Sequence, residues 1–458
     1  MKRPASESIK YTFSTIFARS VRWFAACRTV TEPELADSLT ALREFARQER
    51  ITVVELNLFD GLGECTEPEA VAATTAMVAA VSWSGPMPLV NRIPQSPGDG
   101  LVAWEAIGVG PDPCVPDAVS PDAVSPDDTG SIVADRGAVL IRRDAETISV
   151  EYAGIRWIHQ TLSGFRLPVG DDSRQGFVHA ACREVLESLR DGLESREPAV
   201  TFGEVVRTWL CLGDITGPEP THDPKTGEQT ITERYRELNR ARTDFFETFA
   251  FLRDRVILPG DVMPRSDETT PVGKFYPAST GIGMDGRGFL AATRAVQSDR
   301  PDLRVVMLEN PRQTSAFDYA HRYSPSSPKF ARAVAVVAER DRSATFFISG
   351  TASITDSESR HSGDVVRQTH ETLDNIAALV GEPNLASMGY PGYGVTLAGL
   401  ASMRVYVKRV SDIPVVRATC EERLPDVPVV YVVADVCRPE LLVEIEAAAM
   451  TVAACCGE

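Results

Sequence analysis

Two glutamates near the carboxy end have the spacing that acid chemistry requires. Glu444 and Glu446 lie in an apolar, strand-like stretch over residues 441–447. Because side chains alternate between the two faces of a strand, both carboxyl groups point the same way. Apolar surroundings raise the pKa of a carboxyl group and keep it protonated near pH 7, as a general acid requires. The spacing fits an exposed edge strand equally well, and the pattern alone leaves both interpretations open.

A cysteine and two arginines are further candidates in the same part of the chain. Cys437 lies seven residues before Glu444, and a cysteine at the end of a strand is most often a small core residue. Arg332 and Arg417 have the planar donor group that binds carboxylates through two parallel hydrogen bonds. Arginines are common on surfaces, so neither residue alone indicates a binding site.

Two other patterns have simpler structural explanations. Residues 281–286 match GxGxxG, but residues 288–296 read at least as well as a strand where a dinucleotide site needs a helix. We interpret these glycines as a turn that lines some other cavity. Asp356, Glu358 and His361 have a spacing that suits metal ligands, and a polar loop between a strand and a helix explains them more simply. We predict neither a metal nor a cofactor.

The elements that position these residues are clearest in the second half of the chain. Apolar residues spaced by three and four predict a helix over 364–380, and Gly381 follows where helices commonly end. We expect an α+β fold in which helices pack on one face of a mixed sheet. The predicted strands cover 304–309, 331–338, 344–350, 403–410, 429–436 and 441–447.

The first half shows a less regular alternation of predicted strands and helices, which permits two copies of one fold. Strands are predicted at 51–58, 138–142, 147–152 and 205–212, and helices at 67–81, 177–193 and 231–246.

Composition suggests where the chain divides. Residues 1–40 are predicted to be an N-terminal tail or extension, and residues 41–230 an N-terminal domain. Residues 231–458 would form the catalytic domain. Residues 108–137 contain a near-repeat of PDAVS. This stretch lacks apolar periodicity and is predicted to be a disordered surface insertion.

Charge and cysteine content exclude several classes of protein. The 458 residues include 47 Lys and Arg against 64 Asp and Glu, a net charge of −17. Such a chain repels nucleic acid and anionic membranes, so an anionic substrate needs its own local arginines. Nine scattered cysteines without a CxxC pair favour the cytoplasm. We expect a monomer or a small homo-oligomer.

Several stretches taken together resemble the chorismatase family, enzymes that cleave chorismate to pyruvate and a cyclic carboxylic acid. The resemblance covers the chain from about Thr201 to its end. It implies two Rid-like (chorismate-mutase-like) domains, a C-terminal one similar to the imine deaminase (Rid) fold and a degenerate N-terminal relative. The resembling stretches are ERYR (233–236), YPASTGI (276–282), RYSP (322–325), KFARA (329–333), FISGTASI (347–354), GDVVRQT (363–369), and CRP (437–439) running into VEIE (443–446).

The resemblance also implies roles for individual residues. Glu444 matches the family's acid, which protonates the terminal methylene of the enolpyruvyl ether. Arginines would bind the two carboxylates of chorismate, and an amide on the long helix would orient a carboxylate or a hydroxyl group. The expected substrate-binding residues are Arg417, Arg332, Tyr323, Gln368 and Thr351.

Gly350 and Cys437 determine the expected product. Family members similar to the 3-hydroxybenzoate-forming branch carry glycine and cysteine at these positions. The glycine leaves room for the ring to shift, so that the substrate's own 4-hydroxyl group displaces the ether oxygen, and the thiol assists the rearrangement. The expected products are pyruvate and 3-hydroxybenzoate, and a 4-hydroxybenzoate side product stays open.

Three alternatives remain. A chorismate hydrolase would release a dihydroxycyclohexadiene carboxylate. A Rid-type imine or enamine deaminase would carry an arginine just before the penultimate strand, where this chain has Pro428 followed by two valines. A non-catalytic small-molecule binder would keep the fold and lose the chemistry.

Overall fold

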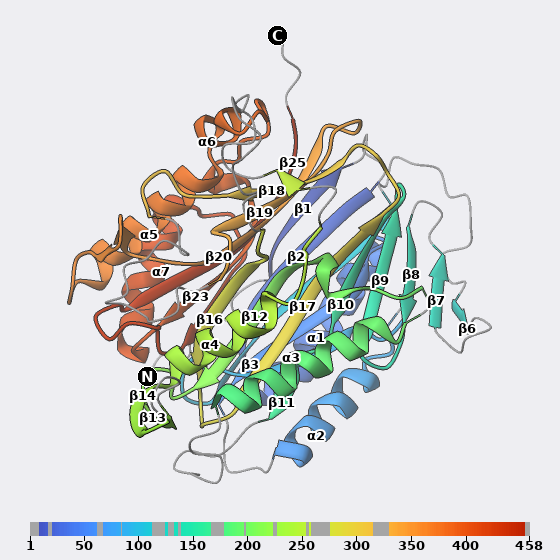
Figure 1. Ribbon diagram of the computed structural model, residues 1–458. Coiled ribbons are helices and arrows are strands. Elements are labelled where there is room, and N and C mark those ends of the chain that lie inside the picture. The colour runs from blue at the N-terminus through green and yellow to red at the C-terminus, as the bar shows by residue number, and fades with distance from the viewer. Residues whose placement is uncertain are drawn as a thin grey trace.

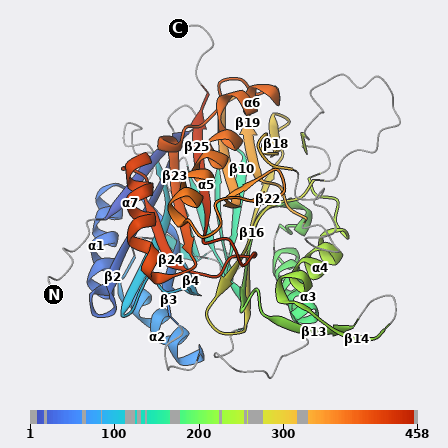
Figure 2. The same cartoon turned by 90° about the vertical axis from the view of Figure 1, so that its left-hand side faces the viewer.

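The predicted α+β fold is confirmed by a computed structural model. Three mixed sheets meet in the interior, and the helices lie on the outside (Figure 1, and from the side in Figure 2). None of the described helices is long and apolar enough to span a membrane. The structure describes residues 9–16, 21–61, 67–83, 85–111, 124–126, 132–135, 139–165, 178–196, 198–222, 227–252, 256–257, 275–314 and 329–453.

The first unit, residues 10–111, forms a five-stranded sheet in the order β1-β2-β5-β3-β4. Only β3 and β4 pair in parallel. Its elements are β1 (Lys10–Ile16), β2 (Val21–Thr31), α1 (Leu35–Gln48), β3 (Thr52–Asp60), α2 (Glu67–Ala80), β4 (Leu89–Pro94) and β5 (Leu101–Pro111).

The middle unit, residues 124–298, repeats this order as β9-β10-β17-β12-β16, again with one parallel pair, β12 and β16. Three short strands extend it: β6 (Val124–Pro126), β7 (Ile132–Asp135) and β8 (Leu140–Arg143). β11 (Ser163–Phe165) pairs with β17, and β13 (Pro218–His222) and β14 (Gln229–Glu233) form a hairpin. The repeated elements are β9 (Thr147–Tyr152), β10 (Ile155–Gln160), α3 (Val178–Glu194), β12 (Val205–Gly213), α4 (Arg234–Phe246), β16 (Ala278–Met284) and β17 (Phe289–Ser298).

The third unit, residues 303–452, has the same order as β19-β20-β25-β23-β24, with β23 and β24 parallel. β18 (Leu303–Leu308) and β15 (Val256–Ile257) extend its edge, and β21 (Ile354–Thr355) and β22 (Glu358–Ser359) form a small hairpin. The other elements are β19 (Ala333–Ala338), β20 (Ser343–Ala352), α5 (Val365–Val380), α6 (Glu382–Ser387), β23 (Leu400–Val407), α7 (Ile413–Arg423), β24 (Val429–Val433) and β25 (Val443–Val452).

The topology therefore contains three copies of a β-β-α-β-α-β-β unit, where the sequence predicted two. Each copy ends with the strand that inserts into the middle of its own sheet. The predicted boundary at residue 230 is wrong, because β16 and β17 come after it and complete the middle sheet.

Two further expectations fail for the described residues. The segment predicted as a tail over residues 1–40 contains β1, β2 and the start of α1, and most of β2 is buried. Within the predicted insertion at 108–137, β5 continues to Pro111, and β6 and β7 pair with each other and with β8. The rest of that insertion lies outside the described residues.

Alternation along β25 separates the helix side of the third sheet from its inner side. Val443 and Ile445 are fully buried in the core cluster that also contains residues of α5 and α7. The intervening Glu444 and Glu446 take the opposite face, toward the middle unit, and both are 4% exposed. The predicted common orientation of the two glutamates is confirmed, and the exposed-edge alternative is wrong.

Candidate active site

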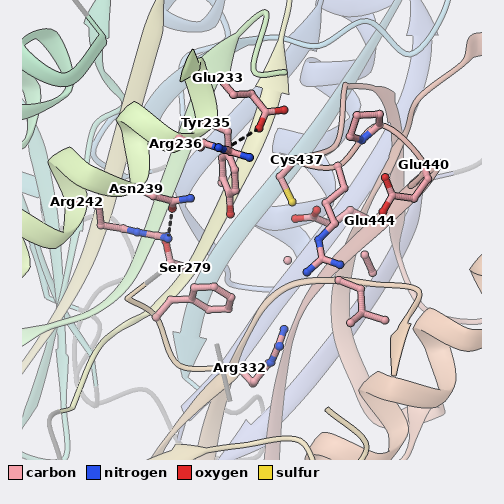
Figure 3. A pocket seen from close by; sticks show the side chains of 17 residues that line it. Glu233, Tyr235, Arg236, Asn239, Arg242, Ser279, Arg332, Cys437, Glu440 and Glu444 are labelled. Atoms are coloured by element: carbon pink, nitrogen blue, oxygen red, sulfur yellow. Dashed lines mark hydrogen bonds and ion pairs between the residues drawn. The ribbon is translucent and has the colours of Figure 1, made fainter. Parts of the chain in front are cut away.

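A cavity of about 340 Å³ lies between the third unit and the middle unit. β20 and β25 supply one side of it, and α4 and β16 supply the other. The loop between β24 and β25 contributes further lining residues, as do Phe330 and Arg332 just before β19. Sites for small molecules typically measure about 300–1,000 Å³. Figure 3 shows the lining side chains, among them Glu233, Tyr235, Arg236, Asn239, Arg242, Ser279, Arg332, Cys437, Glu440 and Glu444.

Glu444 is a buried carboxyl group that lines this cavity. Burial raises its pKa, the nearby charge of Glu446 raises it further, and Arg207 and Arg332 partly oppose the shift. The resulting pKa is about 8, well above the ordinary value near 4.5. At neutral pH the side chain is therefore mostly protonated, which is the state that a general acid needs.

Gly350 brings the main chain of β20 next to this acid. The register of β20 against β25 shifts between Ile348 and Thr351, so the strand bulges at this point. A Cβ atom on residue 350 would lie 2.0 Å from Oε1 of Glu444 and 3.1 Å from Cγ2 of Thr280. A side chain at this position and the present placement of the carboxyl group are therefore incompatible.

The Cys437 thiol lies on the same side of the pocket as Glu444 and faces Tyr235 (Figure 3). Burial raises the pKa of this thiol to about 12, and Glu444 contributes in the same direction. Burial also raises the pKa of the Tyr235 hydroxyl. Both groups are neutral near pH 7, so each can donate a hydrogen bond and neither is a nucleophilic anion.

Four arginines give the cavity a local positive character that the whole chain lacks. Arg242 is 1% exposed and donates to Oδ1 of Asn239 at 2.6 Å and to Oγ of Ser279 at 3.3 Å. Its Nε atom has no hydrogen-bond partner among the described residues. Arg332 is 4% exposed and lowers the pKa of Glu444 by its charge. Arg236 and Arg438 complete the set. The buried guanidinium groups of Arg242 and Arg332 suit a ligand with carboxylates.

Known proteins include relatives of this chain. No family model matches the chain. A protein named 3-hydroxybenzoate synthase, from Streptomyces hygroscopicus, is 36% identical over 311 residues, which are 67% of this chain and 79% of that protein. A protein named chorismatase, from Streptomyces rapamycinicus, is 40% identical over 174 residues, 37% of this chain and 50% of that relative.

The chain belongs to the chorismatase family. The resemblance noted in the sequence is thereby confirmed. A crystal structure of a chorismatase matches the fold with a TM-score of 0.54 at 20% identity, covering 93% of this chain and 98% of that one. The fold described above is therefore the chorismatase fold.

Arg417 does not line the pocket of this chorismatase family member, contrary to the expectation. It lies on α7, and its guanidinium group sits 4.6 Å from the ring centroid of Tyr431. Its charge lowers the pKa of Cys27 on β2, which places it where the third unit meets the first. The pocket borders α4 of the middle unit, and α7 holds the equivalent place in the third unit.

Gln368 and Thr351 were expected to contact the substrate. In the structure both bind other parts of the protein instead. Nε2 of Gln368 donates to the carbonyl oxygens of His361 and Glu440, and its Oε1 accepts from N of Leu442 at 2.7 Å. Gln368 thus holds the loop that leads into β25. Thr351 is 1% exposed, does not line the pocket, and donates to a main-chain oxygen. Tyr323 lies outside the described residues.

The middle unit supplies residues that the residue-level analysis missed, namely Tyr235, Asn239 and Arg242 on α4. The signal was present in the ERYR stretch at 233–236, which forms the start of this helix. α4 begins at Arg234 and not at residue 231, because Ile231 belongs to β14.

The structure also places the GxGxxG match and the group of Asp356, Glu358 and His361. Residues 281–286 continue β16 into a turn toward β17, so no helix follows, and Gly281 lines the pocket. Asp356 lies in the turn between β21 and β22, Glu358 begins β22, and His361 follows that strand. Among the described residues no group of three metal-ligating side chains is close enough to hold an ion.

Proposed function

We propose that this protein cleaves chorismate to pyruvate and 3-hydroxybenzoate, with Glu444 as the general acid. The observation that carries the proposal is a buried, protonated Glu444 in an arginine-lined cavity beside Gly350 and Cys437. The name of the 3-hydroxybenzoate synthase relative supports the same ring product.

The reaction begins with proton transfer from Glu444 to the terminal methylene carbon of the enolpyruvyl group. Positive charge then develops at the ether carbon, and the bond between the ring and the ether oxygen breaks, with its electrons passing to that oxygen. Pyruvate leaves. Arg332 and Arg242 are placed to hold the two carboxylates while this happens.

In the second step the substrate's own 4-hydroxyl oxygen attacks the ring carbon that the ether oxygen leaves. Its proton returns to the Glu444 carboxylate, and the oxygen then bridges ring carbons 3 and 4. The bond from this oxygen to carbon 4 breaks with its electrons passing to the oxygen, carbon 3 loses its hydrogen as a proton, and the oxygen takes up a proton, which gives 3-hydroxybenzoate. No water enters, so the two products together contain all atoms of chorismate. The absence of a side chain at position 350 provides space for the ring to shift.

Product analysis tests this proposal directly. We expect the purified protein and chorismate, without added metal or nicotinamide, to give equal amounts of pyruvate and 3-hydroxybenzoate by chromatography. A dihydroxycyclohexadiene carboxylate as the main product would show that water, and not the 4-hydroxyl group, completes the reaction. Ammonia release from an amino-acid-derived enamine, with chorismate untouched, would establish the deaminase instead.

Replacement of Cys437 by alanine tests the product assignment. Because the thiol is protonated and faces the cavity beside Glu444, we expect C437A to keep pyruvate release within about tenfold of wild type. The share of 3-hydroxybenzoate among the ring products should fall. Cys420 is a matched control, since burial also raises its pKa to about 12 but it lies on α7, in the core of the third unit and outside the pocket lining. C420A should leave the product ratio unchanged, and an unchanged ratio in C437A contradicts the role of the thiol.

A further inference from the structure

A buried cluster of charges occupies the centre of the molecule, where the three sheets meet. We call its three carboxylates and three guanidinium groups the central charge cluster. Each of its members is less than 9% exposed, and their formal charges cancel. The members are Glu55 on β3, Glu105 on β5, Glu446 on β25, Arg207 on β12, Arg294 on β17 and Arg404 on β23.

The cluster is continuous from unit to unit. Arg294 contacts Glu55 at 2.6 Å, and Arg404 contacts Glu105 at 2.6 Å and Glu446 at 3.3 Å. Nδ2 of Asn57 donates to Glu55 at 2.9 Å and to Glu105 at 3.1 Å, and so joins the two pairs.

Glu446 lies two residues from the cavity-lining Glu444 on β25, and both of its oxygens are bound. Oε2 accepts from Arg207 at 2.8 Å, and Oε1 accepts from the Trp209 indole at 2.8 Å. Burial alone would raise the pKa of Glu446, but Arg207 and Arg404 lower it below its ordinary value. Glu446 is therefore an anion at neutral pH.

We propose that Glu446 is a positioning residue whose fixed negative charge, two residues from Glu444 on the same face of β25, keeps Glu444 protonated. The inference rests on the proposed function, in which that proton is the one transferred. One carboxylate of a close pair stays ionised because two guanidinium groups bind it, and the other then retains its proton because two adjacent buried anions repel.

The other groups that face Glu444 do not provide this effect. Arg207 on β12 and Arg332 before β19 both favour its ionised form. Cys437, from the loop before β25, and Tyr235, from α4, are neutral at pH 7 because burial raises the pKa of each. Apart from burial, Glu446 is thus the group that raises the pKa of Glu444.

The pH dependence of kcat/KM tests the proposal. In wild type the active form is protonated Glu444, so activity holds below about pH 8 and falls as the pH rises through that value. E446Q removes a negative charge and leaves Arg207 and Arg404 less compensated. Both effects favour the Glu444 anion. The alkaline limb of the pH profile, where kcat/KM falls as the pH rises, should therefore move to lower pH by about one unit or more.

Two further variants separate this effect from a loss of structure. R207Q removes a cation that favours the Glu444 anion, so its alkaline limb should move to higher pH. Damage to the fold would not shift the limb to lower pH in E446Q and to higher pH in R207Q. Opposite shifts in these two variants therefore indicate an electrostatic effect on Glu444. E446D keeps the charge and should restore the limb toward wild type. E105Q removes an equally buried carboxylate of the cluster that is not beside Glu444, and should leave the limb in place.

Infrared spectroscopy of the protein without substrate measures the protonation state of Glu444 independently of catalysis. The carbonyl band of the protonated carboxyl group, identified by its loss in E444Q, should disappear near pH 8 in wild type and at lower pH in E446Q. If this band behaves as expected and chorismate is not consumed, the proposed function fails while the electrostatic role of Glu446 stands. If the band and the limb of E446Q stay at the wild-type pH or move upward, the role of Glu446 is overturned.

Discussion

The E444Q variant is expected to bind chorismate and to release pyruvate about a thousandfold more slowly than wild type, within the range of about 10²–10⁴ that a general acid contributes. Glutamine has nearly the same shape as the protonated acid and the same neutral charge, but its amide does not protonate a carbon. The loss should therefore appear in kcat, while the Kd for chorismate from calorimetry changes little.

A suitable control is E371Q. Glu371 on α5 is a partly buried carboxylate that accepts from Arg312 at 2.8 Å and from Thr355 at 2.8 Å, outside the cavity. E371Q should keep wild-type kcat. Pyruvate release by E444Q at a rate close to wild type would contradict the assignment of the acid, whatever the products.

The G350A variant is expected to lose about a hundredfold in kcat, because its methyl group occupies the present position of the Glu444 carboxyl oxygen. That oxygen is at the free end of a side chain, so the chain can still fold while the acid turns away. Thermal unfolding should therefore stay near wild type. The space for ring movement also shrinks, so the remaining product should contain less 3-hydroxybenzoate.

Gly61, at the end of β3, offers the matched control. A Cβ atom there meets nothing closer than 3.8 Å, and its backbone is acceptable to alanine. G61A should retain both rate and product ratio. Full activity in G350A would show that the carboxyl group need not occupy the position seen in the structure.

Local patterns in the third unit predicted its elements well. The spacing of apolar residues over 364–380 matches α5, whose first turn is capped by Asp364, and the alternation around Glu444 matches β25. These patterns reflect burial against neighbours in the same unit, which periodicity records directly. The two glutamates of the site were found for this reason.

The remaining features depend on contacts between units, which leave no periodic signal. β2 is apolar along most of its length because both of its faces are covered, so it shows no alternation. The residues around Arg417 indicate that a cation lies near a sheet. They do not indicate which junction between units that cation faces. Arg242 reaches the pocket from a different unit than Glu444, so no spacing along the chain relates the two.

The triplicated architecture also shows how one junction became specialised. Register pairs Glu444 with Tyr406. Counted from the bulge beside the central strand of each sheet, the corresponding pairs are Leu290 with Cys211 in the middle sheet and Ala103 with Phe59 in the first. The acid occurs in one copy, and the other two copies carry an apolar residue at this position. A chain of this design has one proton donor where a symmetric trimer of identical subunits would have three, and leucine and alanine at the two sister positions leave those surfaces free to serve as framework.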